Sequence, residues 1–217
     1  MATILSAIET RVLGSLIEKQ VTTPEYYPLT LNSLTAACNQ KNNRHPVTSY
    51  SEDEVSQGLE SLREKNLAYV FYGSTSRVPK YKHVALEVLH LNAAELALMC
   101  VLMLRGGQTP GELRGNASRL YEFSGLEEIE QTLNGLMSRD GDPMVARLPR
   151  QPGQKEVRFV HLLNGEPAEI VVESPAQRRP PPPSTDRVSL LEQEVASLKS
   201  RVQDLQQQFD SFKKQFE

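Results

Sequence analysis

The chain has 217 residues, of which 39% are hydrophobic and 24% are charged, an ordinary balance for a globular protein. Its formal net charge of -3 provides no overall attraction to nucleic acid, so any phosphate binding must come from a local patch. The longest apolar run, residues 96–104, is far shorter than a membrane span, and no basic segment precedes an apolar core at the N-terminus. We therefore expect a cytoplasmic protein with no membrane partner.

Two cysteines, Cys38 and Cys100, are the whole thiol inventory, and each falls within a helical pattern. Small hydrophobic side chains buried in a reducing compartment explain them better than a disulfide or a metal pair.

Two capping boxes predict helices that match each other. Ser6-x-x-Glu9 predicts a helix over about residues 6–19, with a polar face formed by Arg11, Ser15, Glu18 and Lys19. Asn92-x-x-Glu95 begins a second helix that is apolar nearly all round. The two helices align without a gap, and the alignment continues into Thr23-Pro24 and Thr109-Pro110. This pattern is typical of a duplicated unit.

Two further helices and a hairpin follow in each copy. In the first copy the helices begin near Thr30 and Ser51, and in the second copy near Thr109 and Leu126. Extended runs on either side of Gly73 in one copy and Gly153 in the other predict the hairpins. Three helices and a hairpin, repeated, are the element order of winged helix-turn-helix domains. The predicted fold class is α+β, mainly α with small β-wings, arranged as two tandem winged-helix domains over residues 1–88 and 89–163.

A proline-rich linker over residues 164–186, with four consecutive prolines, leads to a heptad pattern over residues 187–217. Valine and leucine at alternating spacings of three and four favour a parallel two-stranded coiled coil, and hence a homodimer. A helix that folds back on its own domains remains an alternative. The predicted dimerisation residues are Val188, Leu191, Val195, Leu198, Val202, Leu205, Phe209 and Phe212.

The inventory of catalytic motifs argues against an enzyme. The sequence lacks a P-loop, an H-E-x-x-H, a C-x-x-C and a G-x-S-x-G motif, so we predict no catalytic, cofactor-binding or metal-binding residues. His83 and His161 occupy matched strand positions in the two copies, which indicates a role in the wings rather than shared metal ligation.

The third helices are unsuited to DNA, although winged-helix domains usually read the major groove with this helix. They begin with the acidic segments "SEDEV" and "GLEEIE", which favour the helix dipole but repel phosphate. Basic and amide side chains lie instead in the loop "NQKNNRHP" (residues 39–46) and in the wings, although an exposed loop and solvated cations would look the same. The candidate nucleic-acid contacts are Asn39, Gln40, Lys41, Asn42, Asn43, Arg44, Arg77, Lys80, Lys155 and Arg158.

Two long segments, "EKQVTTPEYYPLTLNSLTAACNQKNNRHPV" and "LMLRGGQTPGELRGNASRLYEF", resemble the YceH family of uncharacterised bacterial proteins. The resemblance covers roughly residues 5–163 and implies tandem winged-helix domains and a cytoplasmic location. It implies no particular activity.

Two functions remain open. The first is a dimeric DNA-binding, transcription-regulator-like protein that contacts DNA through the loop and the wings, which the habits of the fold favour by analogy. The alternative is a protein-interaction adaptor that uses its winged helices as docking surfaces and binds no DNA.

Overall fold

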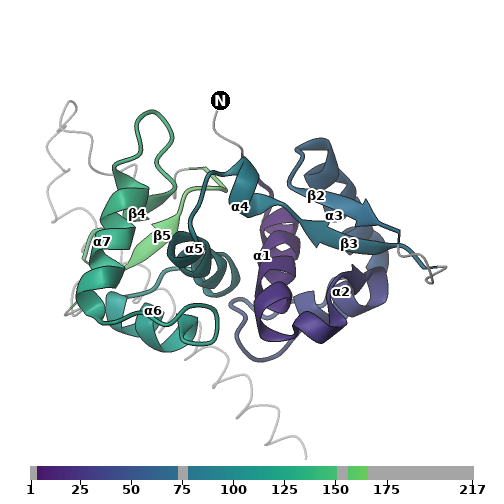
Figure 1. Ribbon diagram of the computed structural model, residues 1–217, viewed down its shortest axis with the longest axis horizontal. Helices are drawn as coiled ribbons and strands as arrows, with labels where there is room; N and C mark the ends of the chain where they lie inside the picture. Colours follow the sequence, from purple (N-terminus) through teal and green to yellow (C-terminus); the bar gives the residue numbers. More distant parts are fainter. Residues whose placement is uncertain (1–3, 73–77, 151–155, 166–217) are drawn as a thin grey trace, which may run out of the picture. The chain divides into compact units, whose positions relative to one another are not determined.

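A computed structural model describes residues 4–72, 78–150 and 156–165, which belong to one compact unit. The protein combines α-helices with small antiparallel sheets (Figure 1). The predicted linker from residue 166 onward and the predicted coiled-coil helix, residues 187–217, lie outside the described residues, as do Arg77 and Lys155.

The first half of the described chain contains three α-helices, a short 3-10 helix and a three-stranded sheet. Its strand order is β1-β3-β2, with Leu29 opposite Tyr81 and Ala68 opposite His83 in antiparallel register. The elements are α1 (Ala7–Thr22), the short 3-10 helix η1 (Pro24–Tyr26), β1 (Leu29–Thr30), α2 (Leu31–Cys38), α3 (Glu52–Glu64), β2 (Ala68–Phe71) and β3 (Lys80–His83).

The second half repeats this order with a smaller sheet. Strands β4 and β5 pair antiparallel, and a bridge between Gln108 and Phe159 takes the place of the β1–β3 pairing. Helix α4 (Ala85–Val88) connects the halves, and the elements that follow are α5 (Ala93–Arg105), α6 (Pro110–Ala117), α7 (Leu126–Met137), β4 (Val145–Arg147) and β5 (Phe159–His161). The helices and hairpin strands predicted before residue 164 are found in the described residues, whereas η1, β1 and α4 were not predicted.

Reciprocal capping boxes begin four of the helices. In each box the N-cap side chain accepts from the N3 backbone, and the N3 carboxylate accepts from the N-cap backbone. The boxes pair Ser6 with Glu9, Ser51 with Glu54, Asn92 with Glu95 and Thr109 with Glu112. The first helix continues three residues beyond the predicted end, to Thr22. Local sequence thus determines where these helices start.

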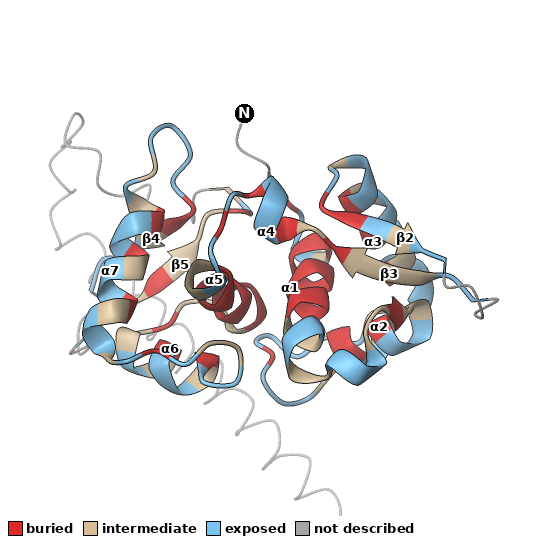
Figure 2. Ribbon diagram, viewed as in Figure 1, coloured by how far each residue is buried: buried red, intermediate tan, exposed pale blue. Residues whose placement is uncertain are grey.

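Helices α1 and α5 pack side by side at the centre of the described unit (Figures 1 and 2). Gly14 permits the contact, because a Cβ at this position would lie 2.9 Å from Leu104 Cδ2. The Cys100 thiol donates to the Gly14 carbonyl at 3.4 Å. Both Cys100 and Cys38 are free and completely buried, as the sequence predicted. The match between the first helices of the two copies therefore reflects a shared place in the core.

Two residues of the predicted polar face of α1 are buried. Arg11 and Ser15 are 4% and 0% exposed, because α2 and α3 pack against α1 on one side and α5 on another. The Arg11 guanidinium donates to the carbonyls of Cys38 at 3.0 Å and Pro46 at 2.6 Å. Periodicity identifies the apolar stripe of a helix, but it cannot reveal that a polar side chain such as Arg11 finds hydrogen-bond partners inside the fold.

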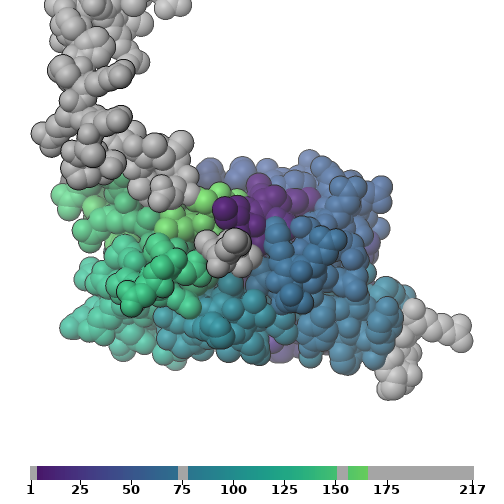
Figure 3. All heavy atoms as spheres, turned by 90° about the horizontal axis from the view of Figure 1, so that it is seen from above, coloured from purple at the N-terminus to yellow at the C-terminus, as the bar shows by residue number. Residues whose placement is uncertain are grey.

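Hydrogen bonds join the first described residues to residues 163 and 164, near the end of the described chain. The Leu5 amide donates to the Leu163 carbonyl at 2.6 Å, and the Thr10 hydroxyl donates to Asn164 Oδ1 at 2.7 Å. In Figure 3 the N-terminal residues, in purple, lie on the surface between the blue first half and the green second half. Among the described helices, none is both long enough and apolar enough to span a membrane.

Candidate functional site

The loop that the sequence singled out, between α2 and α3, is tied down by its own side chains. The Asn39 side chain donates from Nδ2 to the Tyr50 carbonyl at 2.7 Å, and its Oδ1 accepts from the Tyr50 backbone N–H at 2.8 Å. These two hydrogen bonds close the loop. The His45 amide donates to the Leu104 carbonyl at 2.8 Å, near the C-terminal end of α5. Asn39 is therefore a structural residue, and the loop is held against the second half.

Arg44 corrects the sequence prediction, because its side chain is fully buried. Its guanidinium donates to both Glu18 oxygens, at 3.0 and 2.7 Å, and to the Ala37 carbonyl at 2.9 Å. A bidentate pair of this kind uses the donors that a nucleic acid would need. Arg44 therefore anchors the loop to α1 and α2 and is not available as a phosphate contact.

The remaining loop residues face solvent or the second half. Lys41 and Asn42 are exposed. Gln40 accepts from Lys19 Nζ at 3.4 Å, and Asn43 accepts a short hydrogen bond from Arg105 of α5. The loop thus brings its amides next to cations from α1 and α5.

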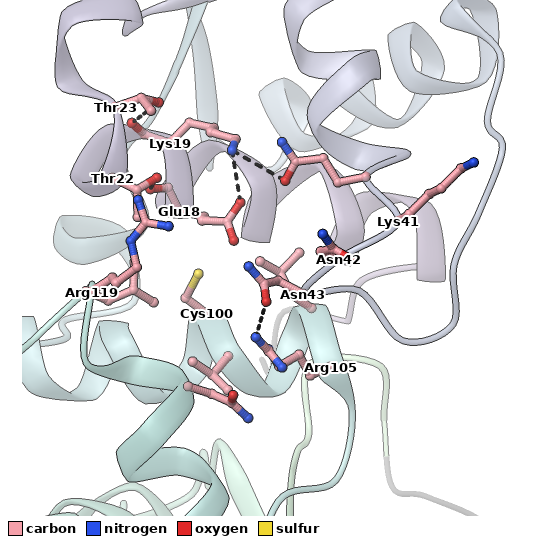
Figure 4. Close-up of a pocket in the computed structure, with 15 residues that line it drawn as sticks. Glu18, Lys19, Thr22, Thr23, Lys41, Asn42, Asn43, Cys100, Arg105 and Arg119 are labelled. Carbon is pink, nitrogen blue, oxygen red and sulfur yellow. Dashed lines mark hydrogen bonds and ion pairs between the residues drawn. The ribbon is translucent and has the colours of Figure 1, made fainter.

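These groups line a cavity of about 410 Å³, which we call the basic pocket (Figure 4). Its walls come from the loop, the C-terminal end of α1, α5 and α6, so both halves contribute. Four lining side chains are cationic and one is acidic: Lys19, Lys41, Arg105 and Arg119 against Glu18. In a chain of net charge -3, this is a concentrated positive region.

The Glu18 carboxylate is shared between Arg44 and Lys19, so it offsets only part of this positive charge. Burial would raise the pKa of the Glu18 carboxyl, but the hydrogen bonds and charges of Arg44 and Lys19 outweigh that effect and lower the pKa. Its carboxylate lies 2.7 Å from Arg44 Nη2 and 3.5 Å from Lys19 Nζ. Lys41, Arg105 and Arg119 form no ion pair with any described residue, so the pocket is suited to an anion.

The sequence did not identify Lys19, Arg105 and Arg119 as site residues. Each lies in or next to a helix whose pattern indicated scaffold, and only the packing of α5 and α6 against the loop brings them together. One signal was available, since Arg105 ends a helix that is otherwise apolar nearly all round.

Of the predicted wing contacts, Arg158 and Lys80 lie in the described residues, and only Arg158 lines a cavity near the loop. Arg158 pairs with Glu112 at 2.9 Å and donates to the Gly107 carbonyl at 2.6 Å, and it lines a second cavity of about 460 Å³ together with Asn43, Arg44 and Arg105. Lys80 lies in β3, paired with both β1 and β2, and lines neither cavity. The structure therefore brings Arg158 to the loop but not Lys80.

The outer faces of the third helices are acidic. On α3 the exposed carboxylates include Glu52, Asp53, Glu60 and Glu64, and on α7 they include Glu127 and Glu130. Arg63 is exposed on α3, but it pairs with Glu60 at 2.6 Å. Both faces are thus negative where they meet solvent.

His83 and His161 lie at matched places, in β3 and β5. Burial lowers the pKa of each imidazole to about 4. His83 Nδ1 accepts from the Ala85 amide at 3.3 Å, and Tyr27 accepts from the His83 amide at 2.9 Å. The environment of both side chains is therefore that of neutral groups inside the fold. In the described part of the chain, no group of three or more His, Cys, Asp or Glu side chains is placed to hold a metal ion.

Comparison with known proteins identifies the family. Residues 5–154 match the family model described as "Protein of unknown function, DUF480". A UPF0502 protein of Opitutus terrae is 53% identical over 90% of this chain and 84% of its own length. A UPF0502 protein of Geobacter sulfurreducens is 47% identical over the whole of both chains. UPF0502 protein YceH of Salmonella paratyphi A is 46% identical over 93% of this chain and 95% of its own, which confirms the resemblance to the YceH family. The chain therefore belongs to the DUF480 family, together with the UPF0502 proteins of these bacteria.

Proposed function

We propose that this protein is a non-enzymatic, cytoplasmic adaptor that docks a basic protein surface on its third helices. The scaffold of the proposal is two tandem winged-helix domains, residues 1–88 and 89–163. The support is the element order of each half and the β1-β3-β2 strand order of the first, in which the strand after α1 pairs with the last strand of the hairpin. Helix α4 (Ala85–Val88) lies at the proposed boundary.

The observation that carries the proposal is the charge of the third-helix faces. In a DNA-reading winged helix this face enters the major groove, between two rows of phosphates. Here it carries exposed carboxylates in both halves, including Asp53 and Glu64 on α3 and Glu127 on α7. Phosphates would be repelled, whereas lysine and arginine of a protein partner would be attracted and correctly oriented.

The first hairpin adds aromatic surface of the kind that protein interfaces use. Tyr69, Phe71 and Tyr72 are 39%, 38% and 78% exposed on or next to β2. Lys82 Nζ lies 5.9 Å from the ring centre of Tyr69 and 5.2 Å from that of Phe71. Tyrosine, phenylalanine and arginine are enriched at protein interfaces, because large rigid side chains bury much area at low entropic cost.

A charge-reversal pair tests this proposal. Asp53→Lys with Glu64→Lys reverses two carboxylates of α3 that form no ion pair with a described residue. We expect the double variant to lose the partners that cross-link to the full chain in cells. Glu25→Lys with Glu122→Lys makes the same charge change at exposed sites outside the third helices and should retain them. Equal cross-linking by the two variants would contradict docking on α3.

DNA binding is the second candidate, and the basic pocket is the observation that favours it. Lys41, Arg105 and Arg119 could contact a phosphate backbone that avoids the third helices. Affinity for random duplex DNA measured across salt distinguishes the two functions, since phosphate contacts produce a steep salt dependence. A wild-type salt slope that falls in Lys41→Ala with Arg119→Ala would make DNA the partner. Arg44→Ala is unsuitable for this test because its buried side chain anchors the loop.

A further inference from the structure

We propose that the basic pocket binds a small phosphorylated molecule, held by its phosphate on the cations of both halves and by its apolar part on the pocket floor. This site lies apart from the third-helix faces and goes beyond the docking function proposed above.

The charge of the pocket selects an anion. Arg105 and Arg119 come from α5 and from the residues after α6, whereas Lys41, on the loop, extends its side chain away from them (Figure 4). None of the three forms an ion pair with a described acidic group. Guanidinium groups bind phosphate oxygens through paired, charge-assisted hydrogen bonds, and two of them suit a dianion better than a single carboxylate.

Neutral donors surround these cations. Asn42 and Asn43 come from the loop, and Asn116, whose side-chain nitrogen also donates to Gln108 Oε1 at 2.7 Å, comes from α6. Asn43 has a positive φ of 61° and already accepts from Arg105, so its amide nitrogen is left as a donor beside that guanidinium. Amides next to guanidinium groups can satisfy the phosphate oxygens that the cations leave free.

The volume of the basic pocket and its apolar lining indicate a small molecule as the ligand. The volume of about 410 Å³ lies within the range of ~300–1,000 Å³ that is typical of ligand pockets. Val101, Leu104 and Leu120 give the pocket an apolar side. A duplex backbone has phosphate and sugar but no apolar group to cover that surface, whereas a phosphorylated molecule with a flat or aliphatic body has both.

The place of the pocket predicts what binding does. Its walls come from α1 and the loop in one half and from α5 and α6 in the other. A ligand that contacts both walls binds only when the halves are packed together, so it stabilises the folded chain by mass action. Ligand binding should therefore raise the thermal unfolding temperature.

The test uses the full chain and three probes: inorganic pyrophosphate, adenosine 5'-monophosphate and adenosine. Calorimetry should show saturable binding of both phosphorylated probes, with adenosine 5'-monophosphate the tighter of the two, and much weaker binding of adenosine. Arg119→Ala and Arg105→Ala should each weaken pyrophosphate binding by about tenfold, the loss expected for one charge-assisted contact. Arg114→Ala is the matched control, because Arg114 is exposed on α6 and lines no part of the pocket.

Three results would overturn the proposal. The first is no saturable pyrophosphate binding at millimolar concentration. The second is an equal loss of affinity in Arg119→Ala and Arg114→Ala, which would indicate only general surface charge. The third is displacement of pyrophosphate by duplex DNA with a steep salt slope that Arg119→Ala reduces, which would assign the cations to a nucleic-acid backbone. Because Arg119 is exposed, Arg119→Ala keeps the test valid even if Arg105→Ala folds poorly. None of these results depends on α3, so the test is independent of the docking function proposed above.

Discussion

At the scale of single residues, Arg44 shows how a basic loop residue can be scaffold. Its bidentate pair with Glu18 and its hydrogen bonds to Ala37 hold the loop on α1 and α2. The same pair favours the ionised form of Glu18, which lines the basic pocket, and offsets part of its charge. The exposed cations next to it are therefore left to act on an anion.

Removing Arg44 should destabilise the protein. Arg44→Met keeps much of the side-chain volume but leaves Glu18 and the Ala37 carbonyl without this partner, and breaking a buried pair typically costs about 3–5 kcal/mol. Urea unfolding of the full chain measures the loss. Lys41→Met, a change in the same loop at an exposed side chain, should alter the unfolding free energy by less than about 0.5 kcal/mol. Equal effects would mean that Arg44 is not an anchor.

His83, which is buried, and His161, which is half-buried, predict a loss of stability in mild acid. Burial lowers the pKa of His83 and His161 from 6.5 to about 4, so the folded state favours the neutral imidazoles. The contribution of these neutral imidazoles to the unfolding free energy is complete above pH 6.5 and is lost as the pH falls toward about 4. Each should reduce the unfolding free energy by on the order of 1 kcal/mol between pH 7 and pH 5.

A histidine replacement isolates this effect. In His83→Gln with His161→Gln, the difference between unfolding free energies measured at the two pH values should shrink, whatever the stability at neutral pH. His45→Gln with His90→Gln removes two exposed imidazoles and should leave the difference unchanged. If the first double variant retained the full difference, the imidazoles of His83 and His161 would not be its cause.

At the scale of elements, the close packing of α1 on α5 depends on the absence of a side chain. Gly14 faces Leu104 Cδ2 and Met103 Cβ, and both α1 and α5 are buried along most of their length (Figure 2). A glycine inside a helix costs about 1 kcal/mol in helix propensity, so here the helix contact outweighs the local preference.

Two glycine substitutions should therefore change the unfolding free energy in opposite directions. Gly14→Leu forces apart two packed helices and should destabilise the protein by about 1–3 kcal/mol or more. Gly115→Ala, in α6, meets no atom within 4 Å and should stabilise by up to about 1 kcal/mol. Thermal unfolding of both variants provides the comparison. A Gly14→Leu variant as stable as the wild type would show that the contact is not tight.

At the scale of the whole molecule, the predicted coiled coil determines the oligomeric state that we expect. Residues 187–217 lie outside the described residues, so the dimer remains a prediction from the heptads. Deleting residues 184–217 should convert a dimer into a monomer by light scattering. Val195→Asp with Val202→Asp should do the same without shortening the chain, since both are a positions. An unchanged mass in both variants would contradict the coiled coil.

The sequence by itself determined the helices and the repeat. Capping boxes, apolar stripes and turn residues act over a few neighbouring positions, so Ser51 and Glu54 begin α3 whatever packs on it. It also determined that the third-helix faces would be acidic, since solvent-facing carboxylates can be read from helical spacing. The two-residue strand β1 was missed because its only support is the pairing with β3, about fifty positions away.

Only the tertiary structure decided which polar side chains are buried and which line the basic pocket. Arg11 and Arg44 look like surface cations in sequence, yet both are buried, because carbonyls and a carboxylate from other elements satisfy their donors. Arg105 and Arg119 look like parts of a scaffold, yet they line a pocket with Lys41. Side chains from α1, α5, α6 and the loop meet only after the halves pack together, and spacing along a chain carries no information about such a meeting.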